Sequence, residues 1–333
     1  MNSIVWKQAR ELVAVDVPKP EVRADEVLIR VALTGICGSD VHAYLGKHRF
    51  RKPPAVLGHE LVGFIEAVGE SVQRFEVGDY VSVNPQIACG TCEPCQGGHE
   101  NLCMNKVVPG TPKWTGTFGE YFPAPEHTVI ALPEDLSLTA GVLIEPLAVA
   151  VHAVRRAEKV SGRRVVVIGA GAIGFLIAVA ARHFGATDIT CVDVDPVALE
   201  AARTAGFATL DPRHDTPHPS DVVFLTAGHQ GAVNQALAAC KRRGTLVLVS
   251  MWEGDIPVDI YQAVFNEINL VGSMTYVTAD YADAVAIAVA HPYVGDVVGA
   301  ALPFSAATEA FEDIVSGRRG TLKTVLEPAQ RPT

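Results

Sequence analysis

Val165-Val-Val-Ile-Gly169-Ala-Gly171-Ala-Ile-Gly174 sets the pattern Gly-x-Gly-x-x-Gly directly after an apolar strand-like run and at the start of an apolar helix-like run. The first glycine permits a tight turn, the second lets the backbone approach a pyrophosphate, and the third lets helix and strand pack closely. The start of the helix, at Ala172 and Ile173, then presents its positive end to the phosphates. These residues therefore predict a dinucleotide-binding site.

An acid that completes such a site stands about 20 residues downstream. The next strand-like run ends in Cys191-Val-Asp193, where a carboxylate accepts hydrogen bonds from the adenosine ribose hydroxyls. Its negative charge would repel the additional phosphate of NADP, so NAD is the expected cofactor. Asp195 is a rival for this role, but its place before Pro196 favours a helix cap.

Strand-like and helix-like runs alternate from about Leu147 onward, which indicates an α/β domain with a doubly wound parallel sheet, a Rossmann domain. The expected strands are Val165–Ile168, Ile189–Val192, Asp221–Leu225, Thr245–Val249 and Asn269–Gly272, and the expected helices include Phe175–Phe184 and Pro196–Ala205.

The residues before this region are rich in glycine and proline and carry short apolar runs such as 27–33 and 80–83, typical of a β-rich domain. A helix at 305–315 and a strand at 323–326 are expected near the end of the chain. These patterns predict a β-rich domain at 1–146, a cofactor-binding domain at 147–290, and a further helix and strand within 291–333.

The composition narrows the classes of partner. The formal net charge is −10, which argues against nucleic acid or an anionic membrane surface and favours small molecules. No secretion signal is visible, and the longest apolar run, 165–181, is too short to span a membrane. A cytoplasmic location is expected.

Cys89, Cys92, Cys95 and Cys103 are spaced so that their thiolates can surround one tetrahedral ion, which predicts a structural zinc site. Two disulfides are the alternative, but 7 cysteines in 333 residues do not resemble a disulfide-rich secreted chain. Four thiolates leave no open coordination position, so this site would stabilise the fold and perform no chemistry.

A second group of metal-competent residues consists of Cys37 and, 22 residues later, His59 and Glu60. One thiolate, one imidazole and one carboxylate can hold zinc and leave a position open for a substrate oxygen. Each residue taken alone also has an ordinary structural interpretation, as a buried thiol, a core imidazole or a surface acid.

Gly58-His59-Glu60-x-x-Gly63-x5-Gly69-x-x-Val72 resembles the zinc signature of the medium-chain alcohol dehydrogenases, and the four-cysteine segment and the glycine motif follow in that family's order. Ile144-Glu145-Pro146-Leu147-Ala148 looks like the polyol and butanediol branch, where a glutamate replaces a second cysteine ligand. The resemblance covers almost the whole chain. It implies a GroES-like catalytic domain formed by residues 1–146 and 291–333 and a Rossmann domain at 147–290. It also implies one catalytic and one structural zinc per chain, and a homodimer or homotetramer.

The resemblance also implies the catalytic roles. Cys37, His59 and either Glu60 or Glu145 would surround the catalytic zinc, which would polarise the alcohol oxygen while the nicotinamide accepts a hydride.

A route for the proton follows from the same resemblance. Ser39 would bond the substrate oxygen and pass its proton through the nicotinamide ribose toward His42. Without the resemblance, these two residues would be interpreted as a turn hydroxyl and an exposed imidazole.

The expected enzyme is a zinc- and NAD-dependent oxidoreductase that interconverts a secondary alcohol and a ketone, with a vicinal diol or acetoin-like hydroxyketone as substrate. A polyol, sugar or cyclitol dehydrogenase is the alternative, and a non-catalytic NAD-binding sensor is the alternative from another class. The butanediol resemblance comes from the stretches Pro85–Cys92, Val249–Glu253 and Asn269–Tyr276.

Two further features bear on the substrate. The segment Leu45-Gly-Lys-His-Arg-Phe-Arg-Lys52 is short and basic, and it is either a solvated charge run or a site that recognises an anionic or hydroxylated substrate. Trp114 and Phe118 are expected to form an apolar wall of the substrate pocket. No function is assigned to the remaining histidines, including His127, His152, His183 and His229.

Overall fold

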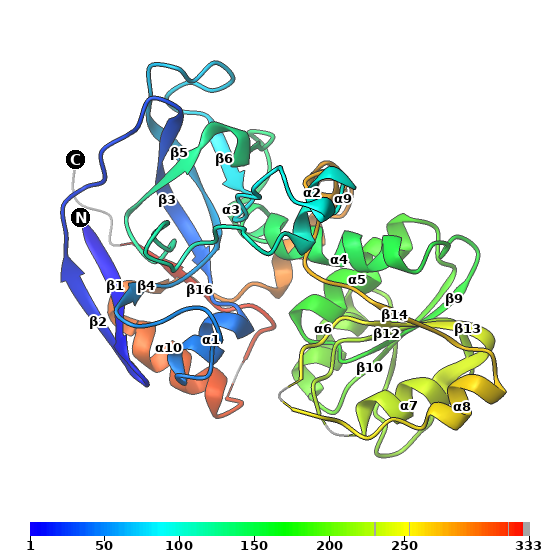
Figure 1. The fold of residues 1–333 in the computed structure, drawn as a ribbon. Helices are drawn as coiled ribbons and strands as arrows, with labels where there is room; N and C mark the ends of the chain where they lie inside the picture. Colours follow the sequence, from blue (N-terminus) through cyan, green and yellow to red (C-terminus); the bar gives the residue numbers. More distant parts are fainter. Residues whose placement is uncertain (230, 253, 319, 329–333) are drawn as a thin grey trace. The chain divides into compact units, whose positions relative to one another are not determined.

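The computed structural model describes residues 1–229, 231–252, 254–318 and 320–328, and the chain divides into two compact units (Figure 1). The first unit comprises Met1–Glu145 and Gly295–Thr333, and the second comprises Pro146–Val294. The borders expected from the sequence, after residues 146 and 290, lie one and four residues from these.

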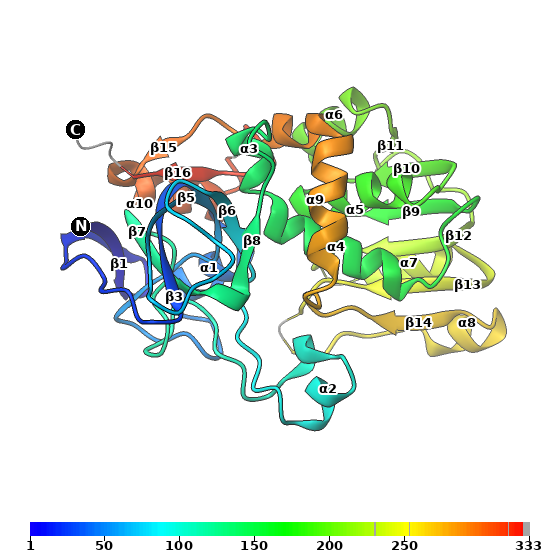
Figure 2. The same cartoon turned by 90° about the horizontal axis from the view of Figure 1, so that it is seen from above.

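A parallel sheet forms the centre of the second unit, and in the described residues its strand order is β11-β10-β9-β12-β13-β14 (Figure 2). Every neighbouring pair is parallel. The chain starts in the middle of the sheet at β9, adds strands on one side, and then returns to add strands on the other, which is the doubly wound order. The strands are β9 (Arg164–Ile168), β10 (Asp188–Val192), β11 (Ala208–Leu210), β12 (Ser220–Leu225), β13 (Cys240–Leu248) and β14 (Asn269–Gly272).

Helices rich in alanine and other apolar residues connect these strands. Helix α5 packs against β9 and β10, and its residues 174–181 are all buried, because this helix is apolar on nearly every face. Helix α7 packs against β12 and β13. The helices of this unit are α5 (Ala172–His183), α6 (Pro196–Thr204), α7 (Ala232–Ala239), α8 (Ile260–Phe265) and α9 (Asp280–Ala290), and α4 (Ile144–Arg156) crosses the border between the units.

The first unit is built mainly from antiparallel strands. In its described part, one sheet has the order β15-β16-β3-β5-β6-β8, with β7 also paired to β3, and a second sheet has the order β2-β1-β4. The strands are β1 (Asn2–Gln8), β2 (Glu11–Asp16), β3 (Glu26–Gly35), β4 (Ala55–Val56), β5 (Glu60–Val68), β6 (Tyr80–Val83), β7 (Tyr121–Pro125), β8 (Val129–Ala131), β15 (Leu302–Pro303) and β16 (Val325–Glu327).

The short helices of the first unit lie between and after these strands. They are α1 (Gly38–Tyr44), α2 (Glu93–Gln96), α3 (Leu138–Gly141) and α10 (Ala307–Val315), and the 3-10 turns of the chain are Glu100–Leu102, Glu126–Thr128, Pro292–Val297 and Phe304–Ala306. No helix in the described part of the chain is long and apolar enough to cross a membrane.

Two aromatic side chains expected in a substrate pocket belong instead to the core of the first unit. Phe118 is fully buried in the cluster that contains Trp6, Tyr44 and Phe311. Trp114 is 6% exposed, packs against Phe122, and donates from its indole nitrogen to the Pro123 carbonyl at 2.8 Å. The nearby glycines allow close packing, since a Cβ atom at Gly116 would lie 2.1 Å from the Leu57 carbonyl oxygen. Both aromatic side chains are core residues, so the expectation of a pocket wall was wrong.

A buried carboxylate ties two helices of the second unit together. Asp280, at the start of α9, is fully buried and accepts from His152 Nδ1 at 2.8 Å and from the Val277 backbone N–H at 2.8 Å, and it also pairs with Arg155. Burial raises the pKa of Asp280, but the hydrogen bonds from His152, Val277 and Arg155 and the charge of His152 outweigh this effect and hold the pKa below its usual value.

We therefore expect Asp280→Asn to lower the free energy of unfolding by about 1–3 kcal/mol, because it leaves buried donors without their charged acceptor. Because the folded-state pKa lies below the unfolded value of about 3.9, this stabilisation is present above that pH and is lost as the pH falls through the folded pKa. Urea denaturation of both proteins at pH 7 and at pH 3 measures the difference. Asp283→Asn is the matched control, since Asp283 meets the same arginine at the surface. Equal effects of the two substitutions would contradict this prediction.

Candidate zinc and dinucleotide sites

The register of two strands gathers the candidate catalytic zinc ligands. Strand β3 ends at Gly35, which lies opposite Glu60, the first residue of β5. Cys37 follows the end of β3 and His59 precedes β5, so both reach the same place as Glu60. The ligand atoms of Cys37, His59 and Glu60 lie within 4.8 Å of one another. One tetrahedral ion with ligand bonds of about 2.0–2.3 Å can bridge such a group, so these residues fit zinc.

Two glycines make room for this arrangement. A Cβ atom at Gly35 would lie 2.0 Å from Glu60 Oε2. Gly58 has a φ of +90°, and a Cβ atom there would lie 2.4 Å from Thr117 Oγ1. A larger residue at either position would displace a candidate ligand or the backbone that carries it.

Asp40 orients two of the candidate ligands. Its carboxylate is fully buried, accepts from the Cys37 backbone N–H at 3.1 Å and the Gly58 backbone N–H at 3.2 Å, and lies 3.4 Å from His59 Nδ1. A carboxylate on Nδ1 leaves Nε2 of the imidazole for a metal. Burial raises the pKa of Asp40, but the charges of His59 and Arg51 and the hydrogen bonds it accepts keep that pKa well below its usual value.

A buried lysine lies beside the same group. Lys323 is 5% exposed and forms an ion pair with Glu60 Oε2. Burial lowers the pKa of Lys323, but the nearby Glu60, Cys37 and Glu145 raise it above its usual value. Glu145 is thus within electrostatic reach of the site. In the described residues the three-ligand cluster contains Glu60 and does not include Glu145, and the direct role of either carboxylate stays a prediction.

Ser39 and His42 lie on one short helix, α1, three positions apart and so on the same face. Ser39 is half-buried and His42 is exposed. This gradient agrees with a proton route from the site toward solvent, and that route stays a prediction.

The basic segment 45–52 divides into inward and outward side chains. Lys47, Arg49 and Lys52 are exposed, as a solvated charge run predicts, whereas Arg51 is 6% exposed. Arg51 Nη1 donates to Ser39 Oγ at 3.1 Å. Sequence reasoning identified the segment but did not single out Arg51, because charge alone does not tell which side chain turns inward.

The four-cysteine segment has the geometry of a metal site. The sulfur atoms of Cys89, Cys92, Cys95 and Cys103 lie within 4.8 Å of one another, and all four thiols are free. Cys89 Sγ lies 4.0 Å from Cys95 Sγ, close to the about 3.8 Å expected for thiolates bound tetrahedrally at about 2.3 Å. Hydrogen bonds from the backbone and hydroxyl of Thr91 lower the pKa of the Cys89 thiol to about 5, which favours the thiolate that binds metal. Burial and the neighbouring Cys92 thiol raise the pKa of Cys95 to about 12, so the metal argument rests on the sulfur geometry.

The glycine motif forms the turn between β9 and α5. Gly169 has a φ of +93°, and a Cβ atom at Gly174 would lie 1.8 Å from the Gly169 carbonyl oxygen. A Cβ atom at Gly171 would meet nothing within 4 Å. Open space at the second glycine is where a pyrophosphate approaches the backbone, and Ala172 and Ile173 begin the helix there.

Asp193 lies at the end of β10 and is tied to this turn. Its Oδ2 accepts from the Ala170 backbone N–H at 2.7 Å, and its Oδ1 accepts from the Asp195 backbone N–H at 2.9 Å. Each carboxylate oxygen keeps a further lone pair for a ribose hydroxyl. Asp195 caps α6 by accepting from the Val197 backbone N–H at 2.9 Å, as its place before Pro196 predicts.

Comparison with known proteins identifies the family. The alcohol dehydrogenase GroES-like domain matches residues 23–134, and the zinc-binding dehydrogenase domain matches residues 172–290. The probable D-xylulose reductase A of Aspergillus clavatus is 36% identical over 91% of this chain and 90% of its own length. This chain belongs to the zinc-dependent medium-chain alcohol dehydrogenases.

Other relatives place this dehydrogenase in the polyol branch. The sorbitol dehydrogenase of Bacillus subtilis is 36% identical over 83% of this chain and 82% of its own. The crystal structure of 2R,3R-butanediol dehydrogenase from Bacillus subtilis superposes with a TM-score of 0.89 at 27% identity, covering 98% of this chain and 99% of that one. The expected family, fold class and enzyme class are confirmed: the protein is a zinc-dependent, nicotinamide-dependent alcohol dehydrogenase with GroES-like and Rossmann domains.

One stretch that resembled butanediol dehydrogenases has a structural explanation. Trp252 packs against the core of the dehydrogenase's second unit, while Met251 is 74% exposed. Glu253 lies outside the described residues.

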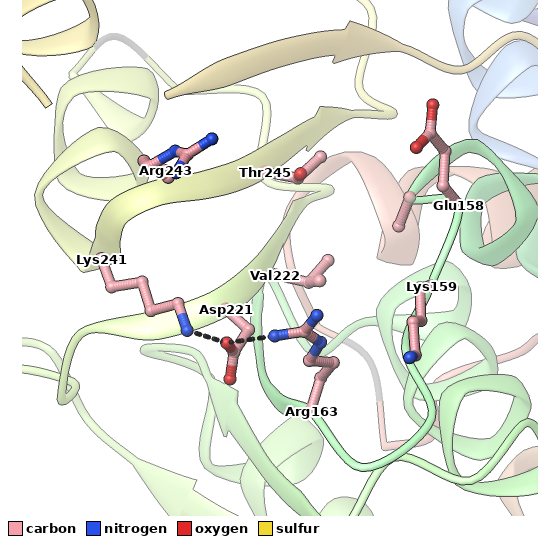
Figure 3. Close-up of a pocket in the computed structure, with 9 residues that line it drawn as sticks. Glu158, Lys159, Arg163, Asp221, Val222, Lys241, Arg243 and Thr245 are labelled. Atoms are coloured by element: carbon pink, nitrogen blue, oxygen red, sulfur yellow. Dashed lines mark hydrogen bonds and ion pairs between the residues drawn. The ribbon is translucent and has the colours of Figure 1, made fainter. Parts of the chain in front are cut away.

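A cavity of about 170 Å³ opens at the amino-terminal ends of β9, β12 and β13 of the dehydrogenase. Figure 3 shows Arg163 and Lys241 turned toward Asp221, and Arg163 Nη1 lies 3.3 Å from Asp221 Oδ1. The glycine motif follows the opposite, carboxyl end of β9, so this cavity is no part of the cofactor site. Its basic side chains are more than two-fifths exposed, and such pairs contribute about 0–1 kcal/mol.

Removing one thiolate tests the structural zinc site. We expect Cys95→Ser to lose one zinc ion per chain and to unfold at a lower temperature, because metal binding contributes directly to folding of such a site. Metal analysis and thermal denaturation of the purified variant measure both effects. Cys240→Ser, a buried thiol outside both clusters, is the control and keeps its zinc. Unchanged zinc content in Cys95→Ser would rule out the four-thiolate site.

Proposed function

We propose that this dehydrogenase oxidises a secondary hydroxyl of a vicinal diol unit to a ketone, with a sugar alcohol such as xylitol or sorbitol as substrate and NAD as hydride acceptor. One observation carries the proposal: Cys37, His59 and Glu60 bring three different ligand atoms together next to the hydroxyl-bearing helix α1. Three protein ligands leave a position open for a substrate oxygen, which suits catalysis rather than structure.

Cys37, His59 and Glu60 would hold the catalytic zinc, with Glu145 near enough to support or replace Glu60. Bound zinc lowers the pKa of an alcohol oxygen and stabilises its negative charge. The structural zinc would be held by Cys89, Cys92, Cys95 and Cys103.

The remaining residues of this chain handle the proton and the cofactor. Ser39 would accept the proton of the substrate hydroxyl and pass it toward the exposed His42, so that the alcohol loses one proton to water and one hydride to NAD. Gly169, Gly171 and Gly174 shape the turn for the pyrophosphate, and Asp193 would select NAD by binding the ribose hydroxyls and repelling a 2′-phosphate.

The choice of sugar alcohols follows from similarity. The D-xylulose reductase and sorbitol dehydrogenase relatives are 36% identical to this chain, whereas the butanediol dehydrogenase structure is 27% identical. Xylitol, sorbitol and 2,3-butanediol all contain a vicinal diol. Butanediol, favoured by local stretches such as 85–92, is therefore the second candidate for the same site.

The decisive experiment follows reduced-nicotinamide absorbance with xylitol, sorbitol, myo-inositol and the separate 2,3-butanediol stereoisomers, each with NAD and with NADP. We expect turnover of a sugar alcohol with NAD and at least 10-fold less turnover with NADP. Repulsion between the Asp193 carboxylate and the 2′-phosphate of NADP should weaken binding by more than about 1.4 kcal/mol. Cys37→Ser should abolish turnover and keep NADH binding. Full activity of Cys37→Ser, or turnover only with NADP, would overturn the proposal.

We also infer that the dehydrogenase assembles as a homo-oligomer through its cofactor unit. Strand β14 is at the edge of the sheet, and one of its sides is unpaired within the described residues. Apolar side chains are exposed on and beside it, and an apolar strand edge left open is a site of uncontrolled pairing. The exposed side chains are Ile260, Tyr261, Val264, Phe265, Leu270 and Met274. A second copy would cover both the edge and the apolar patch.

Light scattering after size-exclusion chromatography tests this assembly. The native protein should have the mass of two or more chains of 35.3 kDa each. Val264→Asp should shift the mass toward that of the single chain, because a charge buried in an apolar interface is costly. Val77→Asp, at an exposed valine of the other unit, should keep the native mass. A native mass of one chain would refute the assembly.

A further inference from the structure

Arg51 is a buried charge in contact with the candidate catalytic residues. Its Nε donates to the Pro109 carbonyl at 3.1 Å and its Nη1 donates to Ser39 Oγ at 3.1 Å. Nη1 also lies 3.6 Å from Asp40 Oδ1, and Nη2 lies 3.5 Å from His59 Nδ1. Arginine is almost never buried to this degree without such partners. The guanidinium is therefore a fixed part of the site.

The surrounding chain is built to turn Arg51 inward. His48 Nδ1 accepts from the backbone N–H groups of Phe50 at 3.2 Å and Arg51 at 3.1 Å, and so closes the turn that precedes the buried side chain. The side chain of Phe50 is 78% exposed, whereas that of Arg51 is 6% exposed. The turn therefore directs Phe50 outward and Arg51 inward. On the other side, a Cβ atom at Gly110 would lie 3.0 Å from Arg51 Nε, so a glycine there leaves room for the guanidinium.

The donors of this guanidinium constrain the serine hydroxyl. Arginine carries donors only and does not titrate, whereas a serine hydroxyl has one donor and two acceptor sites. Because Arg51 occupies an acceptor site of Ser39, the serine proton has to point elsewhere. The adjacent positive charge also favours negative charge that develops on Oγ when the serine gives up its proton.

We propose that Arg51 is a positioning residue that fixes the hydroxyl of Ser39 for proton exchange with the substrate oxygen. This inference rests on the function proposed above and adds a residue to it. Arg51 does not recognise an anionic substrate, because its Nε and Nη1 are already used by Pro109 and Ser39 and its side chain is 6% exposed. A free carboxylate or phosphate would find no open pair of donors on it.

A double-mutant cycle with Ser39→Ala and Arg51→Gln tests the proposal. Arg51→Gln should lower kcat by about 10–100-fold, the loss expected for one hydrogen bond to a charged group. In the Ser39→Ala background the same substitution should change kcat by less than about 2-fold, because its target is gone. Arg51→Lys keeps a charge and a donor and should recover part of the rate.

Three further measurements separate positioning from general damage. Zinc content and the NADH dissociation constant from fluorescence should be the same in Arg51→Gln and the native enzyme. The solvent deuterium isotope effect on kcat should increase in Arg51→Gln, because proton transfer becomes slower. Lys52→Gln, which removes the neighbouring exposed charge, should have native kinetics.

The outcomes distinguish the two proposals. If the losses of kcat are additive in the double mutant, or if Arg51→Gln loses zinc, Arg51 does not position Ser39. Neither result would contradict the proposed alcohol dehydrogenase activity. A native rate in Ser39→Ala would instead remove the serine from the mechanism. An inactive native enzyme on every alcohol of the panel would refute the proposed function itself.

Discussion

The antiparallel pairing of β3 with β5, in which Gly35 lies opposite Glu60, is the constraint on which the catalytic unit depends. Side chains alternate between the two faces of a strand, so a shift of one residue would turn Glu60 away from Cys37. On its other edge β3 pairs with β16, which places Val325 opposite Gly35 and brings Lys323 to Glu60. Strand register, rather than the length of any loop, therefore sets the distances among the candidate ligands.

Charge balance explains why so many ionisable groups share this small buried region. Asp40 is compensated by Arg51 and His59, and Glu60 is compensated by Lys323. An isolated buried charge costs several kcal/mol, whereas hydrogen-bonded pairs reduce that cost. Such pairs also hold each side chain in one rotamer, and a catalytic site requires that precision more than it requires net stability.

Much of the fold was predictable because apolar runs in the sequence form strands that are buried in the sheets. Strand β6 was predicted at its observed bounds, and β14 likewise, because short apolar runs between turn residues leave few alternatives. The predicted strand Thr245–Val249 ends one residue after β13 does. The start of β13 was missed, because Cys240–Gly244 includes three basic residues and lacks the apolar pattern of a buried strand.

The candidate site was only partly predictable. The metal-competent residues stand out by chemical type, so Cys37, His59 and the four-cysteine segment were found. Arg51 and Lys323 were not, because nothing in a charged residue's immediate neighbours shows that it is buried. Their inward direction depends on partners far away in sequence, such as Pro109 for Arg51 and Glu60 for Lys323.

The discontinuous first unit has a consequence for biosynthesis. Lys323 and β16 reach the site only after the whole segment Pro146–Val294 has left the ribosome. The continuous second unit can therefore complete its sheet first, since domains generally fold as units during synthesis. Until the last residues arrive, Glu60 lacks its cation and one neighbour of β3 is missing. The edge of the sheet that β16 covers can therefore be paired only after the second unit has been synthesised.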